Sequence, residues 1–197
     1  MNSFDLHMHS CYSNDGEFTP QELIHMAEEA HLTTIALSDH NTPKGIAEMV
    51  RLAEAKGIRV IPAMEFDTLF EELEVHVLGY GIDYEQPYFQ SLFNALSERK
   101  KAVQIKRVEK IREVFDLDID PAALLKRYAG KNPFPAIVHH IMEQYKDKKE
   151  FADYQPGGRR CEPQPVNFYW DMCSAGKPCY VRVEYPSLKD TVQRIHD

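Results

Sequence analysis

Two hydrophobic periodicities alternate along residues 1–83, and this alternation limits the folds available to the chain. Strand-like stretches, in which every second residue faces the same way, are separated by stretches with the spacing of amphipathic helices. The expected strands are 3–9, 33–38, 58–63 and 75–80, and the expected helices are 21–30 and 43–56. The order β-α-β-α-β-β with short connections predicts an α/β fold built on a parallel sheet or barrel.

The first helix carries a complete set of start signals. Thr19 can cap its N-terminus, Pro20 suits its first position and Glu22 completes a capping box. Gly57 is a suitable C-terminal cap for the second helix.

A mainly helical segment follows the first 83 residues. Helices are expected at 86–115, 121–128 and 135–148, a loop at 153–166, a returning strand at 179–183 and a capped helix at 187–196. We therefore divide the chain into 1–83 as the start of an α/β barrel, 84–178 as a helical insertion and 179–197 as a return to the barrel.

Charge and composition limit the kinds of partner that the chain can bind. Lys and Arg total 23 against 31 Asp and Glu, a formal net charge of −8, which disfavours binding to duplex DNA. No apolar run approaches the roughly 20 residues of a membrane span, and the N-terminus lacks a signal-peptide pattern. We expect no membrane partner and a cytoplasmic location. Four cysteines without a C-x-x-C pair indicate free thiols, with structural disulfides as the alternative.

The pattern His7-Met8-His9 is the first indication of a metal site. On a strand, Asp5, His7 and His9 share one face, and two imidazoles so placed can chelate one cation. Alone, the pattern is weak, because two surface or core histidines explain it equally well.

Four further residues follow or lie in the expected strands: Asp15, His40, Glu65 and His76. Each has an ordinary explanation, such as a turn for Asp15 in Asn-Asp-Gly or a hydrogen-bonded core histidine for His76. Their joint placement near the carboxyl ends of consecutive strands, where α/β proteins form active sites, favours a metal site. Imidazole and carboxylate donors suit Zn, Mn or Fe(II), and a glutamate can bridge two cations.

These motifs resemble the PHP family, named for its polymerase-associated and histidinol-phosphatase members. The matching segments are Asp5-Leu6-His7-Met8-His9-Ser10, Ser13-Asn14-Asp15-Gly16, Thr19-Pro20-Gln21-Glu22-Leu23, Leu37-Ser38-Asp39-His40-Asn41-Thr42, Met64-Glu65 and His76-Val77-Leu78-Gly79-Tyr80. The resemblance implies a distorted (β/α)7 barrel of the stand-alone phosphoesterase type, with two or three divalent metal ions. It implies the ligands His7, His9, Asp15, His40, Glu65 and His76, with Glu65 as the bridge. Asp5 and Asp39 would lie behind these ligands without binding metal.

The chain also departs from the family pattern. Phe134-Pro135-Ala136 stands where comparable members carry Arg-x-His. His139 and His140 could contact the substrate phosphate instead, although an ordinary place on a helix surface explains them as well. The chain lacks an Ala-His-Pro motif and a late Asp-x-His, and a closed barrel typically needs about 250 residues. We therefore expect an incomplete barrel in these 197 residues.

The expected chemistry is hydrolysis of a phosphomonoester or phosphodiester by a metal-bound water, with no separate catalytic side chain assigned. By resemblance, the substrate is a small phosphorylated molecule, such as a nucleotide or a short oligonucleotide end. Two alternatives remain open: a non-catalytic metal-binding module, and amidohydrolase-type hydrolysis of a C–N bond.

Overall fold

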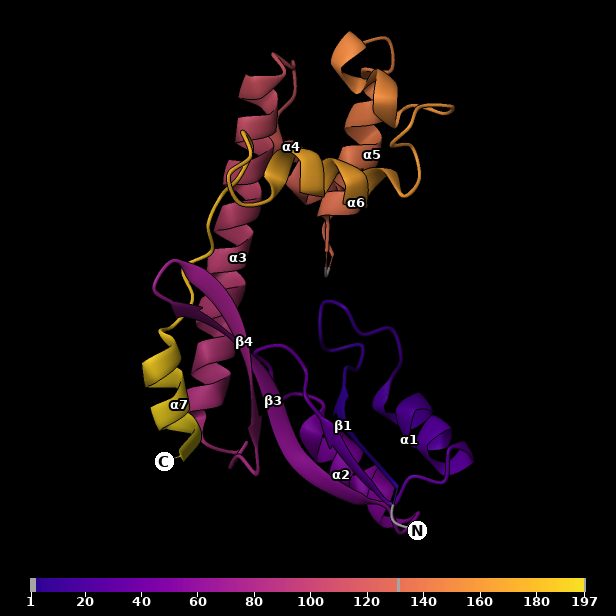
Figure 1. Cartoon of the computed structure of the whole chain (residues 1–197), viewed down its shortest axis with the longest axis vertical. Helices are drawn as coiled ribbons and strands as arrows, with labels where there is room; N and C mark the ends of the chain where they lie inside the picture. The colour runs from indigo at the N-terminus through magenta and orange to yellow at the C-terminus, as the bar shows by residue number, and fades with distance from the viewer. Residues whose placement is uncertain (1–2, 131, 197) are drawn as a thin grey trace. The chain divides into compact units, whose positions relative to one another are not determined.

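A four-stranded sheet with the order β1-β2-β3-β4 organises the N-terminal part of the chain (Figure 1). The computed structural model describes residues 3–130 and 132–196. β1, β2 and β3 are parallel, whereas β3 and β4 form an antiparallel pair. The strands are β1 (Phe4–Met8), β2 (Thr34–Leu37), β3 (Arg59–Phe70) and β4 (Leu73–Tyr80). The predicted α/β class is confirmed.

The first two helices pack against β2. α1 (Pro20–Glu29) has the predicted capping box. α2 (Ile46–Glu54) begins later than predicted because residues 43–46 form a turn, closed by the Ile46 N–H donating to Pro43 O at 3.1 Å. Ile24 and Met49 from these helices are buried with Ile35 of β2 in one hydrophobic cluster. This cluster anchors the parallel strands whose ends carry the candidate ligands.

The chain divides into two compact units. The first comprises Met1–Ser97 and Glu184–Asp197, and the second comprises Glu98–Val183. The remaining helices are α3 (Pro87–Val114), which begins in the first unit and ends in the second, α4 (Pro121–Arg127), α5 (Phe134–Gln144), the 3-10 helix η1 (Lys149–Tyr154), α6 (Gln164–Phe168), the π-helix η2 (Tyr169–Cys173) and α7 (Leu188–His196). The second unit has its own core, which includes Ile111, Val138 and Phe151. Among residues 3–130 and 132–196, no helix is both long and apolar enough to cross a membrane.

Two predicted strands differ from the structure. β3 continues to Phe70 because its second half pairs with β4, a hairpin partner that lies later in the chain. The strand predicted at 179–183 is wrong: these residues are irregular. The carbonyl of Tyr180 accepts from Lys110 Nζ at 2.6 Å, and the Cys179 N–H donates to Met172 O at 2.8 Å. Backbone groups in this segment are therefore bound by a lysine side chain and by a turn. A β-strand requires pairing with a neighbouring strand, and the described residues of this segment have no such pairing.

The second unit should lose stability in acid through Asp171. Arg160 donates two hydrogen bonds to its carboxylate, at 2.8 and 2.9 Å, and these lower the pKa of Asp171. A depressed pKa contributes stability that is complete above the unfolded-state pKa and is lost as pH falls through the folded-state pKa. We expect Asp171→Asn to lower the melting temperature near neutral pH and to flatten its decline in acid.

Glu98→Gln is the matched control, because the Glu98 carboxylate pairs with Lys101 on the open surface of the second unit and contributes little to stability. Thermal unfolding followed across acidic pH values would measure both variants. An unchanged acid slope in Asp171→Asn would contradict this assignment.

Candidate metal centre

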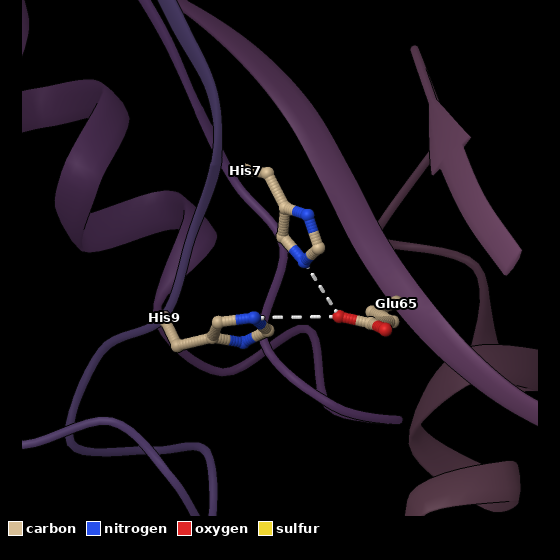
Figure 2. A group of neighbouring side chains, drawn as sticks. All are labelled: His7, His9 and Glu65. Atoms are coloured by element: carbon tan, nitrogen blue, oxygen red, sulfur yellow. Dashed lines mark hydrogen bonds and ion pairs between the residues drawn. The ribbon is translucent and has the colours of Figure 1, made fainter. Parts of the chain in front are cut away.

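The buried carboxylate of Glu65 is the centre of a cluster of histidines. His7 and His9 approach it from the end of β1, and Figure 2 shows both rings directed at the same oxygen. His7 Nε2 lies 2.8 Å from Glu65 Oε2, and His9 Nε2 lies 3.3 Å from it. Glu65 is only 6% exposed. The two imidazoles that the sequence placed on one strand face therefore meet at one carboxylate.

Two more histidines reach the same carboxylate from other elements. His40, which follows β2, places Nε2 3.6 Å from Glu65 Oε2, and His76 in β4 places Nδ1 3.0 Å from Glu65 Oε1. Asp15 joins the group through His40, with 3.4 Å between Asp15 Oδ2 and His40 Nε2. The structure thus brings all six predicted ligands into one connected cluster in the first unit.

The turn after β2 is held directly against β3. His40 and Glu65 form an isolated parallel bridge, and the Asn41 N–H donates to Glu65 O at 2.8 Å. Asn41 adopts a left-handed backbone, with φ of 54°, which asparagine tolerates better than most residues. This turn delivers the His40 ring to the site instead of continuing β2.

A hydrogen-bonded loop positions Asp15. The buried carboxylate of Asp39 accepts from both the N–H and the hydroxyl of Ser10, each at 2.6 Å. Ser13 donates to Asp15 Oδ1 at 2.6 Å and accepts from the backbone N–H of His40 at 3.1 Å. Asp39 therefore holds the loop that carries Asp15.

Asp5 has a local contact. Its Oδ1 accepts from the backbone N–H of His7 at 3.0 Å, on an exposed part of the strand. The carboxylate thus supports the main chain at His7.

The expected position of Glu65 after a strand is wrong, because it lies inside β3. Met64 and Phe66 face the hydrophobic core there, while Glu65 and Asp67 alternate with them.

Asp67 was missed by sequence reasoning. It is buried, and its Oδ1 lies 2.7 Å from Nδ1 of His40. The two-residue spacing from Glu65 would have indicated it if the strand had been extended past residue 63.

Electrostatics differ among these groups. Burial lowers the pKa of His9 despite the nearby Asp15 and Glu65 carboxylates, which favours a neutral imidazole with a free lone pair. Burial acts in the same direction on His40, but the hydrogen bond and charge of Asp67 outweigh it and raise the pKa of His40. Burial opposes ionisation of Asp15, yet the hydrogen bond from Ser13 and the nearby histidines lower its pKa.

The donor set fits divalent metal ions. Three groups have ligand atoms within 4.8 Å of one another: His7, His9 and Glu65; His9, Asp15 and His40; and His40, Asp67 and His76. His9 Nδ1 is buried without a hydrogen-bond partner, although Asp15 Oδ1 lies 3.8 Å away. An orphaned buried nitrogen is costly unless something coordinates it. Mixed imidazole and carboxylate donors are the ligands of Zn, Mn and Fe(II).

The two histidines predicted to contact phosphate lie in the second unit. His139 is exposed on α5, with Nδ1 3.3 Å from Gln164 Oε1 and Nε2 3.6 Å from Glu143 Oε1. The ring of His140 lies against that of Tyr128, with centroids 5.6 Å apart. A phosphate contact by either residue stays a prediction.

The family model of the PHP domain matches residues 5–164, and the chain therefore belongs to the PHP domain family. A 5'-3' exoribonuclease of Haemophilus influenzae is 28% identical over 195 residues, which cover 98% of this chain and 64% of that protein. A 3',5'-nucleoside bisphosphate phosphatase of Chromobacterium violaceum is 27% identical over 197 residues, 98% of this chain and 62% of that protein. The chain thus spans a little under two thirds of the length of these curated relatives.

A solved structure from Bifidobacterium adolescentis has the same fold. It matches with a TM-score of 0.69 and 20% identity, over 99% of this chain and 63% of that one. That protein is assigned, without an established activity, as a metal-dependent phosphoesterase.

The loop that carries Asp15 should be sensitive to substitution of Gly16. A β-carbon there would collide with the carbonyl of Ser10 and lie 2.9 Å from the carbonyl carbon of His9. Overpacking of this kind costs about 1–3 kcal/mol. We expect Gly16→Ala to displace Asp15 and to weaken metal binding about tenfold, since ~1.4 kcal/mol corresponds to that factor.

Calorimetric metal titration would measure this effect. Gly130→Ala is the control, because the nearest atom to a β-carbon there is 3.9 Å away. Equal metal affinity in both variants would show that the loop accommodates the methyl group without moving Asp15.

Proposed function

We propose that the protein binds two or three divalent metal ions and uses them to hydrolyse phosphate esters. The observation that carries this proposal is that four imidazoles each place a nitrogen within 3.6 Å of one buried carboxylate, that of Glu65. The proposed ligands are His7, His9, Asp15, His40, Glu65 and His76, and Mn, Zn and Fe(II) are the metals that suit them. The family and the names of the relatives support the same chemistry.

Glu65 is the proposed bridge between ions. Its Oε2 faces His7, His9 and His40, whereas its Oε1 faces His76. The two oxygens therefore point to different sets of nitrogens, as a bridging carboxylate requires. Bound ions would polarise a phosphoryl group and supply hydroxide from water near neutral pH.

Other residues hold this arrangement in place. Asp39 fixes the loop that carries Asp15 through Ser10, and Asp5 supports the backbone at His7. We further propose that the four strands form part of a distorted (β/α)7 barrel, supported by the parallel start of the sheet and the match to a structure of similar fold.

The proposed substrate is a small phosphorylated molecule, namely a nucleotide or a short oligonucleotide end. The two relatives are named as a 5'-3' exoribonuclease and a 3',5'-nucleoside bisphosphate phosphatase, and RNA and nucleoside bisphosphates are both phosphate esters of nucleosides. The net charge of −8 disfavours long polyanions, but ions in the site would reverse the charge locally.

Product analysis tests the proposal and separates it from the two alternatives. Metal-stripped protein would be reloaded with Mn²⁺ or Zn²⁺ and given a nucleoside 3',5'-bisphosphate and a 5'-phosphorylated oligonucleotide. We expect released phosphate or mononucleotide that depends on added metal. Metal uptake without any turnover would indicate a non-catalytic module, and release of ammonia or an amine from C–N substrates would indicate an amidohydrolase.

Replacement of the bridge should weaken all metal binding together. In Glu65→Gln, a neutral amide replaces the carboxylate shared by the imidazoles, and amides are poor bridging ligands. We expect the affinity for both ions to fall in parallel and turnover to fall by more than about 100-fold, because even the loss of residues that only support metal ligands costs roughly 10- to 100-fold.

Elemental analysis and phosphate release would measure this variant against His25→Ala. His25 is an exposed histidine of α1, 3.5 Å from Glu29, and its loss should change neither quantity. Selective loss of one ion in Glu65→Gln, with the other bound normally, would make Glu65 a terminal ligand.

A further inference from the structure

Asp67 is a buried carboxylate behind the histidine cluster. It lies two residues after Glu65 in β3, so that both side chains leave the strand on the same face. Its Oδ1 lies 2.7 Å from His40 Nδ1, within the range of a charge-assisted hydrogen bond. Its backbone N–H donates to Asn41 Oδ1 at 3.0 Å. Asp67 is therefore bound to His40 through its side chain and to Asn41 through its backbone.

The two ring nitrogens of His40 face different groups. Nδ1 faces Asp67, whereas Nε2 faces Asp15 Oδ2 at 3.4 Å and Glu65 Oε2 at 3.6 Å. A neutral imidazole carries one proton, and an ionised carboxylate can only accept a hydrogen bond. The contact with Asp67 therefore requires the proton on Nδ1 and leaves the lone pair on Nε2, beside the other candidate ligands.

His76 has a weaker relation to the same carboxylate. It stands directly opposite Asp67 in the register of β3 and β4, and its Nε2 lies 3.6 Å from Asp67 Oδ1. That nitrogen also lies 3.5 Å from Glu74 Oε1, while Nδ1 of the ring faces Glu65. The 3.6 Å separation is beyond an ordinary hydrogen bond, so His40 is the residue that Asp67 orients directly.

We propose that Asp67 is a positioning residue, whose carboxylate holds His40 in the Nδ1–H tautomer and leaves Nε2 free to bind a metal ion. The consequence for metal binding rests on the metal centre proposed above. Carboxylates that accept the outer proton of a ligating histidine orient the ring and make it more basic, and their loss typically weakens metal binding by roughly 10- to 100-fold.

Asp67→Asn tests the tautomer with little change of shape. An amide can donate its NH₂ group to Nδ1, which moves the imidazole proton to Nε2, as a carboxylate-to-amide change does in a catalytic triad. We expect ring ¹⁵N NMR of the metal-free protein, above the titration range of His40, to show Nδ1–H in the unmodified chain. The same measurement should show Nε2–H in Asp67→Asn, with Mn²⁺ or Zn²⁺ affinity lowered roughly 10- to 100-fold.

Asp5→Asn is the matched control, because the Asp5 carboxylate contacts a backbone N–H and its substitution should leave the His40 tautomer unchanged. The inference is overturned if His40 carries its proton on Nε2 in the unmodified chain, or if Asp67→Asn leaves the tautomer unchanged. Loss of one whole metal equivalent with an unchanged tautomer would identify Asp67 as a ligand and also overturn it. Because the NMR measurement uses metal-free protein, it tests Asp67 even if the chain binds no metal or hydrolyses no ester.

Discussion

The site is built around a buried carboxylate, Glu65, surrounded by imidazoles. Removing a charge from water costs several kcal/mol unless partners compensate for it, and Glu65 is only 6% exposed. Its partners come from the end of β1, the turn after β2 and the hairpin strand β4. The parallel and antiparallel registers of the sheet must therefore both be correct for the site to form.

The case for a metal ion rests on polar groups in this cluster that the protein itself does not fully satisfy. Burial favours a neutral His9, whose buried Nδ1 has no hydrogen-bond partner, and the nearby Asp15 has a lowered pKa that favours its negative charge. A divalent cation satisfies both, and further carboxylates at Glu65 and Asp67 add negative charge around it. This is why the cluster is better explained as a metal centre than as a set of core hydrogen bonds.

Local features of this structure were predictable from sequence, and non-local ones were less so. The capping box of α1 depends on residues within one helical turn, and the structure confirms it. β3 was predicted too short because its second half is stabilised by β4, so Glu65 was placed after a strand and Asp67 was overlooked. The segment 179–183 has strand-forming residues but no partner strand in the described parts of the chain. The errors at β3 and at 179–183 both concern strand pairing, which amino-acid composition does not reveal.

Anomalous diffraction from crystals grown with Mn²⁺ would show directly whether metal ions bind on both sides of the Glu65 carboxylate. Data recorded at the manganese absorption edge locate the ions independently of any assumed ligand. We expect at least two peaks that share the Glu65 carboxylate, with imidazole nitrogens of His7, His9 and His40 among their ligands. Peaks elsewhere in the molecule, or no peak at this cluster in metal-saturated crystals, would contradict this expectation.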